Sequence, residues 1–329
     1  MLPSDARPLG PYAAIADLDR TLSAWAKNHH AQVSTLGSSV EGRPIHAYAF
    51  GTSAGPTILL SSLMHGVELI GGLALLATVR ALLDETHDPL LERARVVVVP
   101  QVNPDAVVGT LARRRRRVRG GSRGNARGVD LNRNFPAIGP SSWHPFSGSR
   151  YSFSPHYMGP HAFSEPETRA VRDLVVAERP TLSVGFHSFG ELLLYPWAFT
   201  RAPHPRRGHY EALGAAFRRA QRRPYAVGPS MQLYPTIGDM DDWLDASFGT
   251  TSFTVEVGKP RASLFHRDRL FDAYSWMNPP TSVEVDDALA DVVPAMQALL
   301  RAALADVEQM REEPKPRPSL LPRVEIAAK

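Results

Sequence analysis

Two patterns of apolar residues alternate along the chain and predict strands and helices in turn. Continuous runs rich in β-branched residues are typical of buried strands, whereas apolar residues three and four positions apart are typical of helices. The predicted strands are residues 43–50, 57–63, 95–100, 181–186 and 251–257. The predicted helices are residues 11–28, 66–83, 164–176, 208–221 and 286–311.

The helix expected over residues 164–176 has the clearest start signal. Ser164 and Glu167 have the spacing of a capping box, and Pro166 falls in the first turn. Strands that alternate with helices predict an α/β fold with a mixed, mostly parallel central sheet flanked by helices. No repeat or linker precedes residue 312, so we expect one domain over residues 1–311 and a Pro- and charge-rich tail over 312–329.

Composition narrows the chemistry. The 329 residues include no cysteine, which excludes disulfides, a cysteine nucleophile and a thiolate metal site. The net charge of +4 comes from residues 113–123, which hold seven arginines and no acid; without them it is 4 − 7 = −3. The rest of the chain is therefore close to neutral, and its charge predicts no general affinity for nucleic acid.

The ends and the apolar runs indicate no membrane attachment. The N-terminus lacks a basic start followed by an apolar stretch, so no signal peptide is visible. The apolar runs are shorter than the roughly 18 residues that a membrane span needs. We expect a cytoplasmic protein, or a secreted one if the start was trimmed.

Polar residues follow two of the predicted buried strands. His65 and Glu68 come after residues 57–63, and His187 comes directly after residues 181–186. Ligand sites of open α/β sheets lie beyond the carboxyl ends of the strands, and two histidines with a carboxylate make a catalytic zinc site. A His-x-x-Glu pair alone also fits a helix cap or a surface feature, so the spacing by itself leaves both readings open.

Seven short segments, taken in their order along the chain, favour the zinc site over a helix cap or a surface feature. They are "SSVEGRPI" (38–45), "MHGVE" (64–68), "GVDLNRNFP" (128–136), "HAFSEPET" (161–168), "FHSFGELLLYPW" (186–197), "LYPTIGDMDDW" (233–243) and "SFTVEVG" (252–258). Together they resemble the zinc metallocarboxypeptidases of the carboxypeptidase A/B type, peptidase family M14, from about residue 10 to about residue 300. The resemblance implies a zinc carboxypeptidase-like catalytic domain.

The resemblance also implies roles for individual residues. His65, Glu68 and His187 match the ligands of one zinc ion per chain. Glu256 matches the glutamate that takes a proton from the zinc-activated water. Taken alone, Glu256 also fits a solvated residue of an edge strand.

Further matches concern the substrate. Asn132 and Arg133 match the pair that binds the terminal carboxylate, for which a planar guanidinium is suited. Tyr234 matches the tyrosine that closes over the substrate. Arg123 matches the arginine that stabilises the oxyanion, although the other arginines of residues 113–119 are rival candidates. Pro235, after the mobile tyrosine, and Phe189, in place of a frequent tyrosine, depart from the family pattern.

The residue before the Asp-Trp pair lies at the base of the specificity pocket in this family. Here that residue is Asp241, and Asp239 lies two positions earlier. A carboxylate in a closed pocket pairs with a cationic side chain, so we expect a preference for C-terminal Lys or Arg. Both aspartates also fit solvent-facing turn residues after Gly238.

The preferred interpretation is a monomeric zinc exopeptidase that takes peptides with a free C-terminus as its partners. A second hypothesis is a zinc amidase that acts on cell-wall (murein) peptides, because "RGNARGVDLNRNFP" also resembles that subgroup. A third, remote one is a nucleic-acid-binding protein that uses the arginine run. That run lacks interleaved aromatic residues, so no nucleic acid is expected as a partner.

Overall fold

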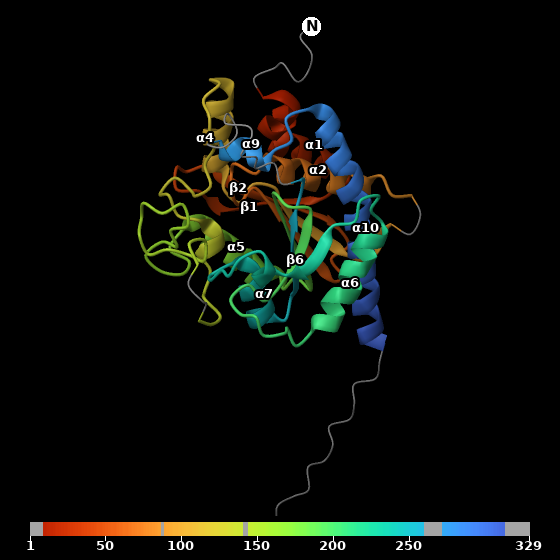
Figure 1. The fold of residues 1–329 in the computed structure, drawn as a ribbon. Helices are drawn as coiled ribbons and strands as arrows, with labels where there is room; N and C mark the ends of the chain where they lie inside the picture. The colour runs from red at the N-terminus through yellow and green to blue at the C-terminus, as the bar shows by residue number, and fades with distance from the viewer. Residues whose placement is uncertain (1–8, 87–88, 141–143, 260–271, 313–329) are drawn as a thin grey trace, which may run out of the picture.

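The computed structural model describes residues 9–86, 89–140, 144–259 and 272–312. One eight-stranded mixed sheet, in the order β1-β2-β4-β3-β5-β8-β6-β7, runs through the molecule and is flanked by helices (Figure 1). The strands are β1 (Gln32–Ser38), β2 (Pro44–Gly51), β3 (Thr57–Ser62), β4 (Arg95–Val99), β5 (Leu182–His187), β6 (Leu192–Tyr195), β7 (Ala226–Pro229) and β8 (Thr251–Glu256). The predicted fold class, a single α/β domain with a mixed sheet, is confirmed; the expected tail lies outside the described residues from position 313.

Helices cover both faces of this sheet. The α-helices are α1 (Leu18–Asn28), α2 (Leu69–Leu83), α3 (Leu90–Arg93), α4 (Pro104–Arg115), α5 (Pro166–Glu178), α6 (Arg207–Arg219), α7 (Met240–Phe248), α9 (Ala273–Met277) and α10 (Ser282–Glu312). Three 3₁₀ helices accompany them in the described chain, η2 (Gly10–Asp17), η3 (Leu131–Arg133) and η4 (Ser230–Gln232).

The central strands β4, β3, β5 and β8 are parallel and supply both hydrophobic cores. Along β3, Ile58 and Leu60 face the core under α1, α2, α6 and α10, whereas Leu59 between them faces the core under α5 and α7. Period-two alternation places successive side chains on opposite faces, so a strand buried on both faces is apolar throughout. This explains why the continuous apolar runs predicted these strands.

The long helix α10 packs beside α6 and α2 along one face of the sheet (Figure 1). By length and composition, Ser282–Gln309 could cross a membrane, with a mean hydropathy of 1.4 in its most apolar 18 residues. Half of that window is buried inside the protein. Its apolar side, including Val292, Met296 and Leu299, belongs to the hydrophobic core, as in a core helix of a globular domain.

Several predicted helix starts differ from the structure. The helix predicted from residue 286 begins at Ser282, and the helix predicted over residues 11–28 begins as the 3₁₀ helix η2 before α1. The helix predicted from residue 66 begins at Leu69, because the chain first makes a turn closed by a hydrogen bond from Glu68 N to His65 O. The capping box predicted for α5 is absent, because Glu165 is the N-cap residue and makes no side-chain cap. Ser164 instead donates to the carboxylate of Glu165, and Glu167 accepts from the backbone of Val40.

Candidate active site

The loop between β3 and α2 carries the first two polar residues of the site. After β3 the chain turns at Leu63, whose φ is 54°, and Asn103 fixes the loop by donating from Nδ2 to Met64 O at 3.1 Å. The turn places His65 and Glu68 side by side, with His65 Nδ1 2.8 Å from Glu68 Oε1. Glu68 occupies the N-cap position of α2 but makes no capping hydrogen bond, so the reading of this pair as a helix cap is wrong.

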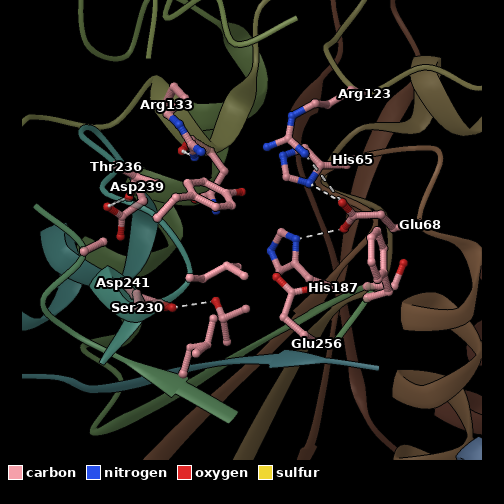
Figure 2. Close-up of a pocket in the computed structure, with 18 of the residues that line it drawn as sticks. His65, Glu68, Arg123, Arg133, His187, Ser230, Thr236, Asp239, Asp241 and Glu256 are labelled. Atoms are coloured by element: carbon pink, nitrogen blue, oxygen red, sulfur yellow. Dashed lines mark hydrogen bonds and ion pairs between the residues drawn. The ribbon is translucent and has the colours of Figure 1, made fainter. Parts of the chain in front are cut away.

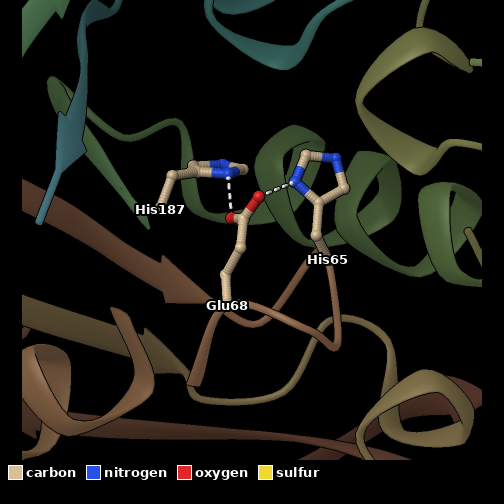
Figure 3. A group of neighbouring side chains, drawn as sticks. All are labelled: His65, Glu68 and His187. Atoms are coloured by element: carbon tan, nitrogen blue, oxygen red, sulfur yellow. Dashed lines mark hydrogen bonds and ion pairs between the residues drawn. The ribbon is translucent and has the colours of Figure 1, made fainter. Parts of the chain in front are cut away.

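The third residue arrives from the neighbouring strand. Because β5 lies parallel to β3, its last residue, His187, comes to the same edge of the sheet as His65 and Glu68. His187 Nδ1 lies 2.9 Å from Glu68 Oε2, so the carboxylate bridges the two imidazoles (Figure 3). The three side chains are 2%, 3% and 6% exposed, and their ligand atoms lie within 4.8 Å of one another.

Asp130 supports this triad from behind. His65 Nε2 lies 3.0 Å from Asp130 Oδ1, which leaves Nδ1 as the nitrogen that faces Glu68 and His187. A carboxylate behind a histidine ligand fixes its ring orientation and raises its basicity. Asp130 is completely buried, and although burial opposes its charge, Arg123 and His65 hold its pKa well below the ordinary value.

The triad fits a zinc ion. Two imidazole nitrogens and one carboxylate oxygen converge from a buried loop and a strand end, and three such protein ligands with a free fourth position are typical of catalytic zinc. Burial opposes the charge of Glu68, but the two neighbouring imidazoles outweigh it and lower its pKa. A deprotonated carboxylate between two histidines is the form that binds a metal ion.

Glu256 is the last residue of β8 and pairs in register with His187 on β5. Strand β8 lies between β5 and β6, so the reading of Glu256 as an edge residue is wrong. Its Oε2 is buried and has no hydrogen-bond partner in the described part of the chain. Burial raises the pKa of Glu256 to about 8, and a cation at the nearby triad would lower that pKa.

Arg123 is the arginine of the 113–123 run that lines the pocket. Its Nε donates to Asp130 Oδ2 at 2.8 Å and its Nη1 lies 3.7 Å from Glu68 Oε1, so the guanidinium is aimed beside the triad. Burial opposes the charge of Arg123, but Asp130 raises the pKa of the guanidinium above its ordinary value. The arginines of residues 113–119 do not line this pocket.

Arg133 lies on the opposite wall of the pocket (Figure 2), and Asn132, its partner in the predicted carboxylate-binding pair, lines the same pocket. Arg133 is 3% exposed and its guanidinium donates to the backbone oxygens of Phe146 and Asn132. Asn132 accepts a hydrogen bond from Met240 N through Oδ1. Tyr234 lines the same wall, with its ring 5.9 Å from the Arg133 guanidinium and edge-on to Phe146.

Asp241 and Asp239 both line the pocket and are 8% and 6% exposed, so the reading of them as solvent-facing turn residues is wrong. Asp241 accepts hydrogen bonds from Ser252 Oγ at 2.5 Å and Thr254 Oγ1 at 2.6 Å. Burial raises the pKa of Asp241 to about 6. Asp239 caps α7 by accepting from Asp242 N, and it also accepts from Thr236 Oγ1.

The sequence did not indicate several residues in and behind the pocket. Asp130 stands inside the "GVDLNRN" segment, but its contact with His65 spans 65 positions and no local pattern shows it. Thr254, Leu194 and Ala198 line the pocket from β8, β6 and the segment after β6. Period-two alternation along β8 places Thr254 on the face of Glu256, which was the one available signal.

A family model described as zinc carboxypeptidase matches residues 20–276. The chain therefore belongs to the zinc carboxypeptidase family, peptidase family M14, whose members are zinc peptidases. It is 29% identical over 247 residues to carboxypeptidase B of Astacus astacus, which covers 69% of this chain and 79% of that protein. The chain spans 57% of the length of the carboxypeptidases B of Helicoverpa zea and Rattus norvegicus.

Solved structures have the same fold. Carboxypeptidase A from Helicoverpa armigera aligns with a TM-score of 0.74 at 24% identity, over 89% of this chain and 74% of that chain. Murein-tripeptide amidase from Escherichia coli O157 aligns with a TM-score of 0.52 at 25% identity, over 82% of this chain and 91% of that chain.

Proposed function

We propose that this protein is a zinc-dependent exopeptidase that hydrolyses the last peptide bond of substrates with a free C-terminus. The observation that carries the proposal is a single pocket lined on one side by His65, Glu68 and His187 and on the other by Arg133. A carboxylate held by Arg133 would place the preceding peptide bond toward the triad. An endopeptidase has no need of such a buried cation opposite its metal ligands.

The positions of Glu256 and Arg123 suit particular steps of peptide-bond hydrolysis. Bound zinc supplies a Lewis acid and lowers the pKa of water. Glu256 accepts the proton of the attacking water and transfers it to the nitrogen of the leaving amine as the C–N bond breaks. Arg123, fixed by Asp130, donates to the carbonyl oxygen as negative charge develops on it.

The substrate contacts complete the assignment. Arg133 and Asn132 bind the terminal carboxylate, for which the guanidinium offers two parallel donors. Tyr234 lies next to Arg133 and closes over the terminal residue. Asp241 lines the pocket and would favour a C-terminal Arg or Lys, because an apolar side chain would leave the buried carboxylate with its two hydroxyl donors but without a countercharge.

The direct test compares peptides that differ only at the last residue. We expect kcat/KM for a peptide ending in Arg to exceed that for the matched Leu peptide at least tenfold, about 1.4 kcal/mol. The Asp241→Ala variant should lose most of that margin and keep zinc. Equal rates in the wild type would refute the specificity, and cleavage of C-terminally amidated peptides at the same rate would refute the carboxylate-binding role.

The second candidate is a zinc amidase for murein peptides, because a murein-tripeptide amidase shares the fold at 25% identity. Incubation with a muropeptide in parallel, followed by mass spectrometry, separates the two. Release of a single C-terminal residue from ordinary peptides supports the exopeptidase. Cleavage of the muropeptide alone supports the amidase.

A further inference from the structure

The arginine run is unexplained by the chemistry above. Residues 113–119, here called the arginine segment, form the end of α4 and the turn after it. Arg113, Arg115, Arg116, Arg117 and Arg119 are exposed, and among the described residues no carboxylate pairs with any of them. An uncompensated cluster of this density attracts anions and is not used to stabilise the fold.

The arginine segment is fastened to the rim of the active site. Arg114, its one partly buried arginine, stacks on Tyr274 of α9 with 4.0 Å to the ring centroid and lies 3.8 Å from Asp272. Gly120 N donates to Asp272 Oδ1 at 2.8 Å. Figure 1 shows α4 and α9 next to each other, and Met277 at the end of α9 lines the pocket.

The chain just after the arginine segment touches the metal-ligand loop. A Cβ placed on Gly121 would lie 2.5 Å from Val67 Cγ2, so the backbone at Gly121 packs directly against the loop that carries His65 and Glu68. Asn278, just beyond α9, donates to Val67 O at 2.8 Å and accepts from Ile70 N. The backbone just after the arginine segment is therefore held against the wall of the site, with the exposed arginines close to it.

Substrate residues before the scissile bond are expected to pass the wall of the pocket that carries Arg123. If Arg133 and Asp241 hold the terminal residue, the scissile carbonyl lies toward Arg123 and the triad, on the opposite side of the pocket (Figure 2). Residues before the scissile bond then leave the pocket on the side of Arg123. Only three residues separate Arg123 from Arg119, the end of the arginine segment.

We propose that the arginine segment is an exosite for acidic residues upstream of the scissile bond, so that the preferred substrates are peptides with an acidic stretch before a C-terminal basic residue. This inference rests on the proposed exopeptidase function. The attraction acts between exposed charges, so it should strengthen substrate capture and lower KM, with little effect on kcat. It should also weaken at high salt, because the Debye length falls from about 10 Å at 0.1 M to about 3 Å at 1 M.

The test uses three peptides that share a C-terminal Ala-Ala-Arg. One is an N-blocked tripeptide, and the others add four Glu or four Gln upstream. At low salt we expect kcat/KM for the Glu peptide to exceed that for the Gln peptide about tenfold, mostly through KM. The margin should disappear near 1 M salt, whereas the N-blocked tripeptide should change little.

Two triple variants distinguish the effect of the arginine segment from the effect of the protein's net charge. The variant R115Q/R116Q/R119Q should lose most of the margin for the Glu peptide and keep the wild-type rate on the N-blocked tripeptide. Arg117 is left in place because its φ of 57° makes a substitution there ambiguous. The control R20Q/R218Q/R219Q removes three exposed arginines from α1 and α6 and should keep the margin.

The outcomes are distinguishable. No cleavage of any of the three peptides would refute the proposed exopeptidase with its preference for C-terminal Arg or Lys. Cleavage of all three without a Glu margin would refute the exosite and leave the exopeptidase standing. If the control variant loses the preference for the Glu peptide to the same extent, the preference arises from the net charge of the protein and the exosite is wrong. If a labelled oligonucleotide binds through the same three arginines while the Glu peptide gains nothing, the surface is a nucleic-acid site and the exosite is wrong.

Discussion

If Asp241 selects the C-terminal residue as proposed, its protonation state should control the preference for basic substrates. Burial, the largest influence, raises the pKa of Asp241 to about 6, and the hydroxyls of Ser252 and Thr254 oppose that rise. We therefore expect the kcat/KM ratio of Arg over Leu peptides to be high at pH 7.5 and to fall as the pH drops through 6. Protonation would remove the charge that is proposed to pair with the substrate guanidinium.

Measuring both peptides in the same buffers cancels the titration of groups that affect both reactions equally. The Asp241→Asn variant should give a low ratio that does not vary with pH. A wild-type ratio that stays constant between pH 5 and pH 8 would contradict the role of Asp241 as the charged group.

Asp130 is predicted to control metal affinity without binding the metal. It accepts from His65 Nε2 and from Arg123 Nε, so Asp130→Asn weakens the support of both side chains. Loss of such a partner typically reduces metal affinity about 10–100-fold. Competition with a zinc chelator would measure it. Asp105→Asn is the matched control, because Asp105 is also a buried carboxylate but bonds Ser39 and Arg43, and it should leave zinc affinity unchanged.

Glu256 should be separable from the metal ligands. Glu256→Gln keeps the shape of the side chain but removes the base, so we expect bound zinc to remain and kcat to fall about 10²–10⁴-fold. Glu178→Gln, at a surface ion pair with Arg95, serves as control and should keep its rate. Normal turnover by Glu256→Gln, or loss of its zinc, would contradict the assignment.

The elements that the sequence predicted best are those buried on both faces. Strands β3, β4, β5 and β8 were predicted to within about one residue at each end. In a strand buried on both faces nearly every residue is apolar, so the ends of the apolar run mark the ends of the strand. Strand β1 was missed because most of its residues are exposed, and β6 and β7 have four residues each, too few for a period. Helix α7 was missed because three aspartates in nine residues hide its apolar side.

The residues of the site also divide into those with a local signal in the sequence and those without one. His65 and His187 were found because each stands at or just beyond the end of a buried strand, where a polar side chain is conspicuous, whereas Glu256 was found only through the family resemblance. The resemblance already favoured Arg123 among the seven arginines, but the contact between Asp130 and His65 joins distant segments and is supplied only by the folded chain. Tertiary contacts of this kind leave no periodic signal in the sequence.

The packing of α2 on β5 fixes the spacing of the triad. A Cβ on Gly71 would lie 2.8 Å from Phe186 O and 3.4 Å from His187 N, so only glycine allows this approach. Gly71→Ala should push α2, and Glu68 before it, away from His187. We expect weaker zinc binding and a loss of about 1–3 kcal/mol of unfolding free energy from overpacking.

Gly208→Ala is the control for that substitution. Gly208 lies in α6, and a Cβ there meets no atom within 4 Å. Alanine in an open helical position should leave zinc affinity unchanged and raise stability slightly, by about 0.4–1 kcal/mol. If both variants bind zinc as the wild type does, the packing of α2 does not determine the spacing of the triad.

At the scale of the whole molecule, the fold should be independent of the metal that its site is suited to bind. Two hydrophobic cores cover the two faces of the sheet, and the triad lies at the ends of β3 and β5, where Glu68 already pairs with both histidines. Removal of zinc by a chelator should therefore abolish hydrolysis while the circular dichroism spectrum stays that of the folded protein. Added zinc should restore hydrolysis.

Zinc should nevertheless stabilise this fold, because it binds the native state alone. At a free zinc concentration 100 times Kd the gain is about 2.7 kcal/mol, which raises Tm by about 4 °C in a domain of about 300 residues. Calorimetry with and without chelator would measure it. His187→Ala should show neither the zinc-dependent shift nor hydrolysis, yet remain folded. A wild type that unfolds on chelation would mean that the metal contributes to the fold itself, and full hydrolysis without bound metal would refute zinc dependence.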